Sequence, residues 1–80
     1  MIVKLKYIGV ITDNLPEKLE LEEDSSIDML IEELKSDYDP QRIEDLVMKS
    51  TFLVNKSKAR KETILKDGDE LLVLSVLGGG

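Results

Sequence analysis

The chain has 80 residues and a formal net charge of −6, which fits one domain with a small core and disfavours nucleic acid as a partner. It contains no cysteine and no histidine, so we expect no disulfide, no metal site, no bound cofactor and no self-contained enzyme activity. It also lacks the apolar run of about 18 residues that spans a membrane and the apolar block of a signal peptide, so the cytoplasm is the expected location.

The first half of the expected fold opens with a hairpin. Residues 2–8 alternate in polarity with period two, which predicts a strand. Its inward set would be Val3, Leu5 and Tyr7, and its outward set Ile2, Lys4, Lys6 and Ile8. A turn signal follows at residues 13–16, and alternation resumes over 17–22, which predicts a second strand paired with the first.

The polarity period then changes to that of a helix. Ser25 followed by Asp28 resembles a capping box, and an apolar stripe follows at i, i+3, i+4 and i+7. The stripe consists of Ile27, Leu30, Ile31 and Leu34. Asp39-Pro40 ends this helix and begins a short second one, whose inward residues would be Ile43, Leu46 and Val47.

Three more strands are expected in the remainder of the chain. The apolar run 52–54 predicts the third strand, Asn55-Lys56 a turn, and residues 59–62 a short fourth strand. The segment 66–69 is a strong turn signal, and the nearly continuous apolar run 70–77 predicts an interior strand.

This order of elements predicts an α+β roll. A mixed sheet of four to five strands would pack on one main helix and a short second helix, with the first and last strands as parallel neighbours. The domain would occupy residues 1–77, and Gly78-Gly79-Gly80 would form a flexible tail because glycine does not stabilise the strand that it extends.

The three final glycines suggest that the reactive group is the carboxylate of Gly80. A carboxylate must be activated before it reacts, for instance as an acyl adenylate made from ATP by a partner enzyme. Gly79 and Gly78 would form a slim tether that enters a narrow channel, and Val76 and Leu77 an apolar shoulder for the partner. The alternative is a frayed chain end without function.

Three segments carry a resemblance to the MoaD/ThiS family of ubiquitin-like sulfur carriers. Residues 52–55 read Phe-Leu-Val-Asn, residues 65–70 read Leu-Lys-Asp-Gly-Asp-Glu before an apolar strand and the glycines, and residues 3–9 are similar to the family's first strand. The resemblance implies a β-grasp fold and is closer to MoaD, the molybdopterin synthase small subunit.

The resemblance also implies a function and its partners. An adenylating enzyme of the MoeB/ThiF type, related to ubiquitin-activating enzymes, would use ATP to activate Gly80, and a sulfur donor would convert it to a thiocarboxylate. The sulfur would pass to the molybdopterin precursor on a synthase large subunit of the MoaE type. Alternatives are thiamin thiazole formation with thiazole synthase, conjugation through Gly80 as a protein modifier, and a non-covalent adaptor with an inert tail.

An outward apolar patch is the second candidate site. If Leu71 and Val73 face the core, then Leu72 and Leu74 face outward together with Ile8. Exposed aliphatic clusters of this kind mark interaction surfaces, and the family resemblance implies partner docking on the same face. The alternative is that the second helix covers these side chains.

Overall fold

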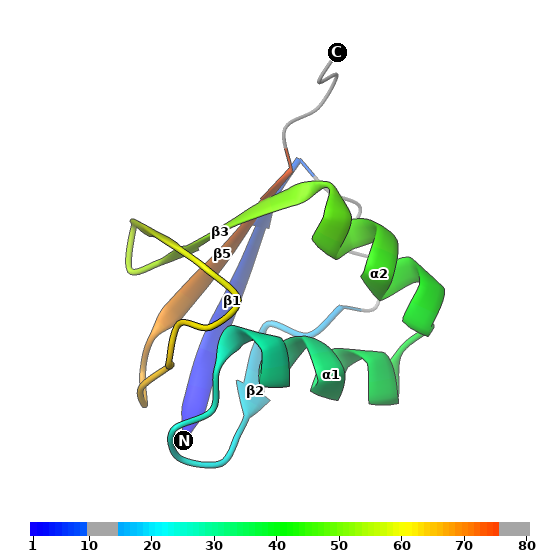
Figure 1. Cartoon of the computed structure of the whole chain (residues 1–80). Helices are drawn as coiled ribbons and strands as arrows, with labels where there is room; N and C mark the ends of the chain where they lie inside the picture. The colour runs from blue at the N-terminus through cyan, green and yellow to red at the C-terminus, as the bar shows by residue number, and fades with distance from the viewer. Residues whose placement is uncertain (10–14, 76–80) are drawn as a thin grey trace.

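The computed structural model describes residues 1–9 and 15–75. In chain order its elements are β1 (Ile2–Ile8), β2 (Lys18–Glu20), α1 (Ile27–Asp37), α2 (Pro40–Met48), β3 (Ser50–Val54), β4 (Ser57–Ala59) and β5 (Glu70–Ser75). Neither helix in these two stretches is long and apolar enough to cross a membrane. The architecture is the expected α+β roll (Figure 1).

The strands form one mixed sheet in the order β2-β1-β5-β3-β4. β1 and β5 are parallel, and the other neighbours are antiparallel, which confirms the expected central pair. Parallel neighbours need a long connection, and here the chain between them contains both helices and the β3–β4 hairpin. As a result, β1 and β5 both end at the same edge of the sheet, with Ile8 opposite Leu74.

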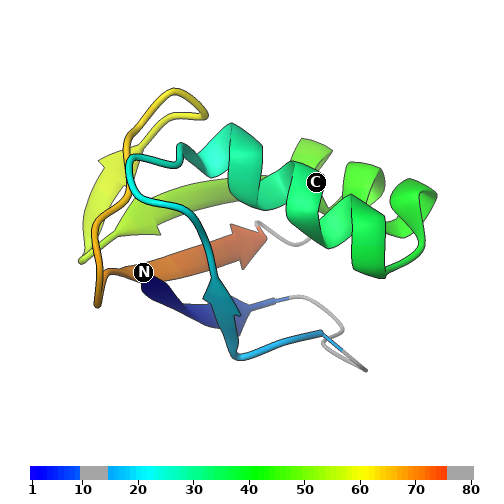
Figure 2. The ribbon, with the colours of Figure 1, turned by 90° about the horizontal axis from the view of Figure 1, so that it is seen from below.

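Both helices cover one face of the sheet, as Figure 2 shows. The inward side chains of the sheet and the apolar stripe of α1 form a single core. Leu21, between β2 and α1, and Leu65, between β4 and β5, also belong to it. Its buried members are Val3, Leu5, Leu21, Ile27, Leu30, Ile31, Leu34, Ile43, Phe52, Leu65, Leu71 and Val73. Leu46 and Val47 of α2 pack against the same cluster, so α2 also belongs to the inner layer. The opposite face of the sheet is therefore not covered by α2.

The start of α1 differs from the expected capping box. The N-cap is Ser26, whose hydroxyl accepts a hydrogen bond from the Met29 amide at 3.3 Å. Ser25 is buried instead, and its hydroxyl donates to the Glu22 carbonyl at 2.7 Å. The prediction was one residue early because Ser26 forms a β-bridge with Ile64, which sets where the helix begins.

The second helix begins as expected, with Asp39 as N-cap and Pro40 at its first position. The fourth strand was placed too late: it covers Ser57–Ala59, not 59–62. Asn55 and Lys56 both take positive φ angles, 50° and 72°, which makes a two-residue turn and lets pairing resume at once, with Val54 opposite Ser57.

Candidate functional site

Five of the predicted site residues lie outside the described part of the chain. These are Val76, Leu77, Gly78, Gly79 and Gly80, the first two of which are also the last two residues of the expected strand 70–77. The described part of β5 ends at Ser75, one residue after Leu74, so the chain continues toward the glycines from the edge of the sheet where β1 also ends.

The three other predicted site residues lie together on the outer face of the sheet, away from the helices. Ile8 is opposite Leu74 on the parallel neighbour strand, and its side chain is 54% exposed. Leu72 and Leu74 are half-buried and alternate with the fully inward Leu71 and Val73. The outward orientation is confirmed.

A fourth aliphatic residue extends this patch. Leu53 of β3 is half-buried, and the register places it opposite Leu72, next to the Thr51–Leu74 pair. We call Ile8, Leu53, Leu72 and Leu74 the apolar patch. Sequence reasoning missed Leu53 because the run 52–54 is apolar throughout, and only its alternation with buried Phe52 shows which way it points. The apolar patch borders the sheet edge from which the chain continues to Gly80.

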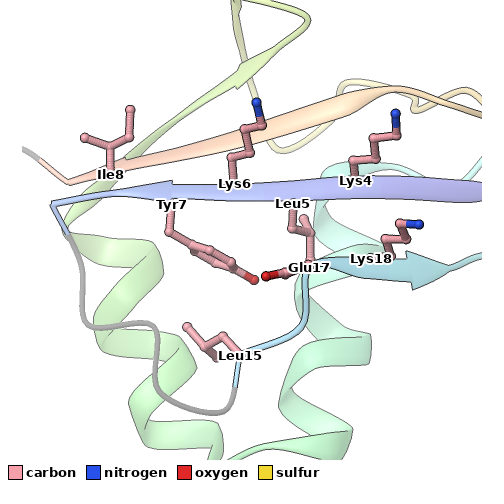
Figure 3. Close-up of a pocket in the computed structure, with 8 residues that line it drawn as sticks. All are labelled: Lys4, Leu5, Lys6, Tyr7, Ile8, Leu15, Glu17 and Lys18. Atoms are coloured by element: carbon pink, nitrogen blue, oxygen red, sulfur yellow. The ribbon is translucent and has the colours of Figure 1, made fainter.

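Lysine side chains lie beside the apolar patch, on β1 and β2. Figure 3 shows Lys4 and Lys6 leaving β1 on the same side as Ile8, opposite Leu5 and Tyr7. Lys6 forms an ion pair with Glu70 on β5, with an Nζ–Oε2 distance of 3.3 Å. Lys4 lies opposite Lys18 on β2.

Within residues 1–9 and 15–75, no group of three or more acidic side chains is arranged to hold a metal ion.

A hollow of about 580 Å³ opens beside the apolar patch, where pairing between β1 and β2 stops after Lys4 (Figure 3). We call it the lysine hollow because Lys4, Lys6 and Lys18 line it. Tyr7 also lines the hollow, and its hydroxyl donates a hydrogen bond to the Pro16 carbonyl at 2.7 Å. Burial, with a smaller contribution from Tyr38, raises the pKa of Tyr7 to about 12.

The Tyr7 shift predicts a loss of stability in strong base. The folded pKa, about 12, lies above the ordinary value of 10.0, so the neutral phenol's contribution is complete below about pH 10 and is lost as the pH rises through 12. A Tyr38→Phe variant leaves Tyr7 as the single tyrosine, and its phenolate absorbance should titrate well above that of a free tyrosine amide. A midpoint equal to that of the free amide would contradict the burial of the Tyr7 ring.

Asn55 and Asp69, which belong to two of the segments that resemble the family, form hydrogen bonds that stabilise the fold. The Asn55 Nδ2 donates to Asp69 Oδ1 at 2.9 Å, and the Asn55 Oδ1 accepts from the Glu70 amide at 3.0 Å. Asp69 Oδ2 also accepts from the Lys66 amide at 2.8 Å, and the Asp69 carbonyl accepts from the Lys4 amide. These bonds tie the β3–β4 turn to the start of β5, which sets the position of β5 in the sheet.

Replacing Asn55 with alanine should lower the free energy of unfolding by about 1–2 kcal/mol, because two side-chain hydrogen bonds and a residue that tolerates positive φ are lost together. Denaturant unfolding measures the change. Asn55→Gly is the matched control: it keeps the backbone conformation and loses only the hydrogen bonds, so it should be destabilised less. Equal losses for the two variants would contradict a backbone contribution.

Gly9, directly after β1, makes a close backbone contact that the sequence pattern did not reveal. Its φ is +76°, and a Cβ built on it would lie 2.6 Å from the carbonyl oxygen of Ser75. Only glycine fits both conditions. Gly9 thus holds the end of β1 against the end of the described part of β5, beside the apolar patch.

The comparisons with known proteins agree with this architecture. The sequence profile of the ThiS family matches residues 5–80, almost the whole chain. No curated protein is significantly similar in sequence.

Two solved structures share the fold. The solution structure of the Haloferax volcanii HVO 2177 protein superimposes with a TM-score of 0.76 at 17% identity, covering 100% of this chain and 87% of that one. A chain in the complex of subunits 1 and 2 of molybdopterin-converting factor from Helicobacter pylori 26695 gives a TM-score of 0.67 at 21% identity, with both chains fully covered.

These similarities confirm the β-grasp fold, a five-stranded mixed sheet with two helices. The profile match covers far more than half of the chain and therefore decides the family. The chain belongs to the ThiS family of β-grasp, ubiquitin-like sulfur carriers, which carry sulfur for enzymes and are not catalysts themselves.

Proposed function

We propose that this chain carries sulfur as a thiocarboxylate on Gly80 and donates it for molybdopterin biosynthesis. The observation that carries the proposal is the family match, which extends through the final glycines to residue 80. A chain of the Helicobacter pylori molybdopterin-converting factor complex has the same fold over its full length, which makes molybdopterin biosynthesis the first pathway to test.

The chemistry would occur in three steps on a partner enzyme. The Gly80 carboxylate attacks the α-phosphate of ATP, which releases pyrophosphate and leaves an acyl adenylate. The outer sulfur of a donor protein's persulfide then displaces AMP, which forms an acyl disulfide between Gly80 and the donor. A thiol attacks the donor's sulfur in this disulfide, which leaves a thiocarboxylate on Gly80 and a new disulfide between the thiol and the donor. Gly79 and Gly78 would let the reacting carbonyl reach the nucleotide without steric hindrance. The adenylating enzyme binds the ATP, and the carrier supplies the carboxylate.

Intact-mass measurement tests this proposal. The protein is incubated with ATP, a sulfur donor and a purified adenylating enzyme of the MoeB/ThiF type from the same organism. The mass should rise by the difference between one sulfur and one oxygen atom, and addition of the synthase large subunit and its pterin substrate should reverse the change. Lasting conjugates to lysines of other proteins would instead support a modifier, and sulfur transfer only with thiazole synthase would support the thiamin pathway.

The apolar patch would be the surface on which these partners dock, with Val76 and Leu77 extending the contact toward the glycines. The support is its position: Ile8, Leu72 and Leu74 lie beside the point where β5 continues toward Gly80. A partner that grips this surface brings its active site within reach of the last residues. Aliphatic side chains that are half-buried in the free protein are typical centres of such interfaces.

Replacing Leu74 with aspartate should weaken binding to the adenylating enzyme by at least about 10-fold, because it places a charge in the centre of the contact. The free energy of unfolding should fall by only about 1 kcal/mol because the Leu74 side chain is half-buried. Met29→Asp is the control, since Met29 is exposed on α1 in the other layer. Equal loss of binding in both variants would contradict docking on the outer face.

A further inference from the structure

Two lysines lie opposite each other on β1 and on β2, the outermost strand of the sheet. Lys4 of β1 is directly opposite Lys18 of β2, and like charges in this arrangement destabilise a strand pair. Glu70, which lies opposite Lys4 on the other side, is paired with Lys6 instead. Within the described stretches, neither Lys4 nor Lys18 has a carboxylate oxygen within 4.0 Å. The free protein thus has two exposed like charges in register with no carboxylate between them, and a single charge reversal would give them opposite signs.

The same two lysines and Lys6 line the lysine hollow, and among the described residues that line it Glu17 is the only acidic one. The hollow is continuous with the apolar patch, because Ile8 lines it as well (Figure 3). A side chain of a protein docked on the apolar patch could therefore enter the hollow without a separate binding event.

The charge of this face is opposite to that of the molecule. The whole chain has a net charge of −6, and residues 13–45 carry thirteen acidic side chains against three basic ones. The outward positions of the strands carry four lysines against two acids. These residues are Lys4, Lys6, Lys18, Lys58, Glu20 and Glu70. Such local reversal of charge steers a partner of complementary charge to one face.

We propose that the lysine hollow receives acidic side chains of the protein that docks on the apolar patch, an inference that rests on the proposed function. The occupant is a protein carboxylate and not a free phosphate, because the lysines are exposed, flexible side chains and the hollow is continuous with an aliphatic surface. The partner's carboxylates would neutralise Lys4 and Lys18. Binding would then remove the unfavourable interaction between these two lysines, which makes the free energy of binding more favourable.

Charge reversal tests the proposal by opposite effects on stability and on binding. Lys18→Glu turns the repulsive pair into an attractive one, so its melting temperature should equal or exceed that of the wild type. Its dissociation constant for the purified adenylating enzyme should nevertheless rise about 10-fold at low salt, and this difference should shrink at about 0.5 M salt. Lys4→Glu should weaken binding in the same way.

Lys61→Glu is the matched control, because it makes the same change in net charge at an exposed residue whose carbonyl accepts from Asp28 in α1, on the helix side. It should change the dissociation constant less than about twofold. An equal loss of binding in Lys61→Glu, unchanged binding in Lys18→Glu, or competition by inorganic phosphate would each overturn the proposal.

Binding is measured without ATP, so it does not depend on sulfur transfer. A wild-type protein that binds the enzyme but never gains sulfur would contradict the proposed function. The lysine variants would still show whether acidic side chains of the enzyme enter the lysine hollow. Failure of the wild type to bind either the adenylating enzyme or the synthase large subunit would overturn the docking surface itself.

Discussion

Removing Gly79 and Gly80 is expected to abolish thiocarboxylate formation without lowering the melting temperature. The deletion takes away the carbonyl carbon on which sulfur would be carried. It should leave the fold intact because the buried core side chains in residues 1–9 and 15–75 lie between Val3 and Val73. Intact-mass measurement after incubation with ATP, a sulfur donor and the adenylating enzyme gives the first result, and thermal unfolding followed by circular dichroism gives the second.

Gly80→Ala is the informative companion to this deletion. It keeps a terminal carboxylate but adds a Cβ beside the reacting carbon, so charging should be slowed and not abolished. Sulfur incorporation into the deleted protein would show that another carboxylate is the carrier. A large loss of stability would show that the final glycines support the fold. The first result would remove the basis for placing the chemistry at Gly80, and the second would contradict a tail that contributes nothing to the core.

The second large effect is expected at Gly9, where alanine should lower the free energy of unfolding by about 3–4 kcal/mol. The substitution forces a side chain into a positive φ of 76° and brings its Cβ to 2.6 Å from the Ser75 carbonyl oxygen. A domain of this size has about 4–12 kcal/mol of stability in total, so the loss would be a large share. Denaturant unfolding measures it directly.

Gly68→Ala separates the two causes. Gly68 also has a positive φ, +84°, but a Cβ there would meet no atom within 4 Å. Its alanine variant should therefore lose only about 1–2 kcal/mol, the cost of the backbone conformation. The difference between the two variants measures the close contact with Ser75. If Gly9→Ala and Gly68→Ala were equally destabilised, the close approach of Gly9 to the Ser75 carbonyl would not contribute to the free energy of unfolding.

Gly9 also bears on function, because it lies where β1 and the described part of β5 end together. If Gly9→Ala shifts Ser75, the direction in which the chain leaves the sheet changes as well. We therefore expect the rate of Gly80 charging in Gly9→Ala to fall more than in Gly68→Ala when both are assayed well below their melting temperatures. A common rate in the two variants would limit the role of Gly9 to stability.

The polarity pattern predicted most of the fold correctly because each strong pattern reports local geometry. The period of two over residues 2–8 and the stripe Ile27–Leu34 place side chains on one face whatever the rest of the chain does. The parallel pairing of the first and last strands also followed, since few topologies accommodate a hairpin, a crossover and a final apolar strand.

The errors fall where long-range contacts decide between similar local choices. Adjacent serines both suit an N-cap, and the bridge between Ser26 and Ile64 selects the second. The fourth strand starts early because Asn55 and Lys56 turn the chain in two residues. Leu65 is buried in the core although nothing in its immediate sequence shows this.

The amino-acid sequence by itself determined the family, the outward direction of Ile8 and the glycines at its end, because motifs and alternation are properties of neighbouring residues. Within the apolar run of β5, burial of Leu71 and Val73 in the structure decided that Leu72 and Leu74 face outward. Only the tertiary structure decided that Lys4 meets Lys18, that Leu53 joins the apolar patch, and that Gly9 touches Ser75. These contacts depend on the register between strands far apart in the chain. Register is set by the turns and by packing of the core, which no local pattern records.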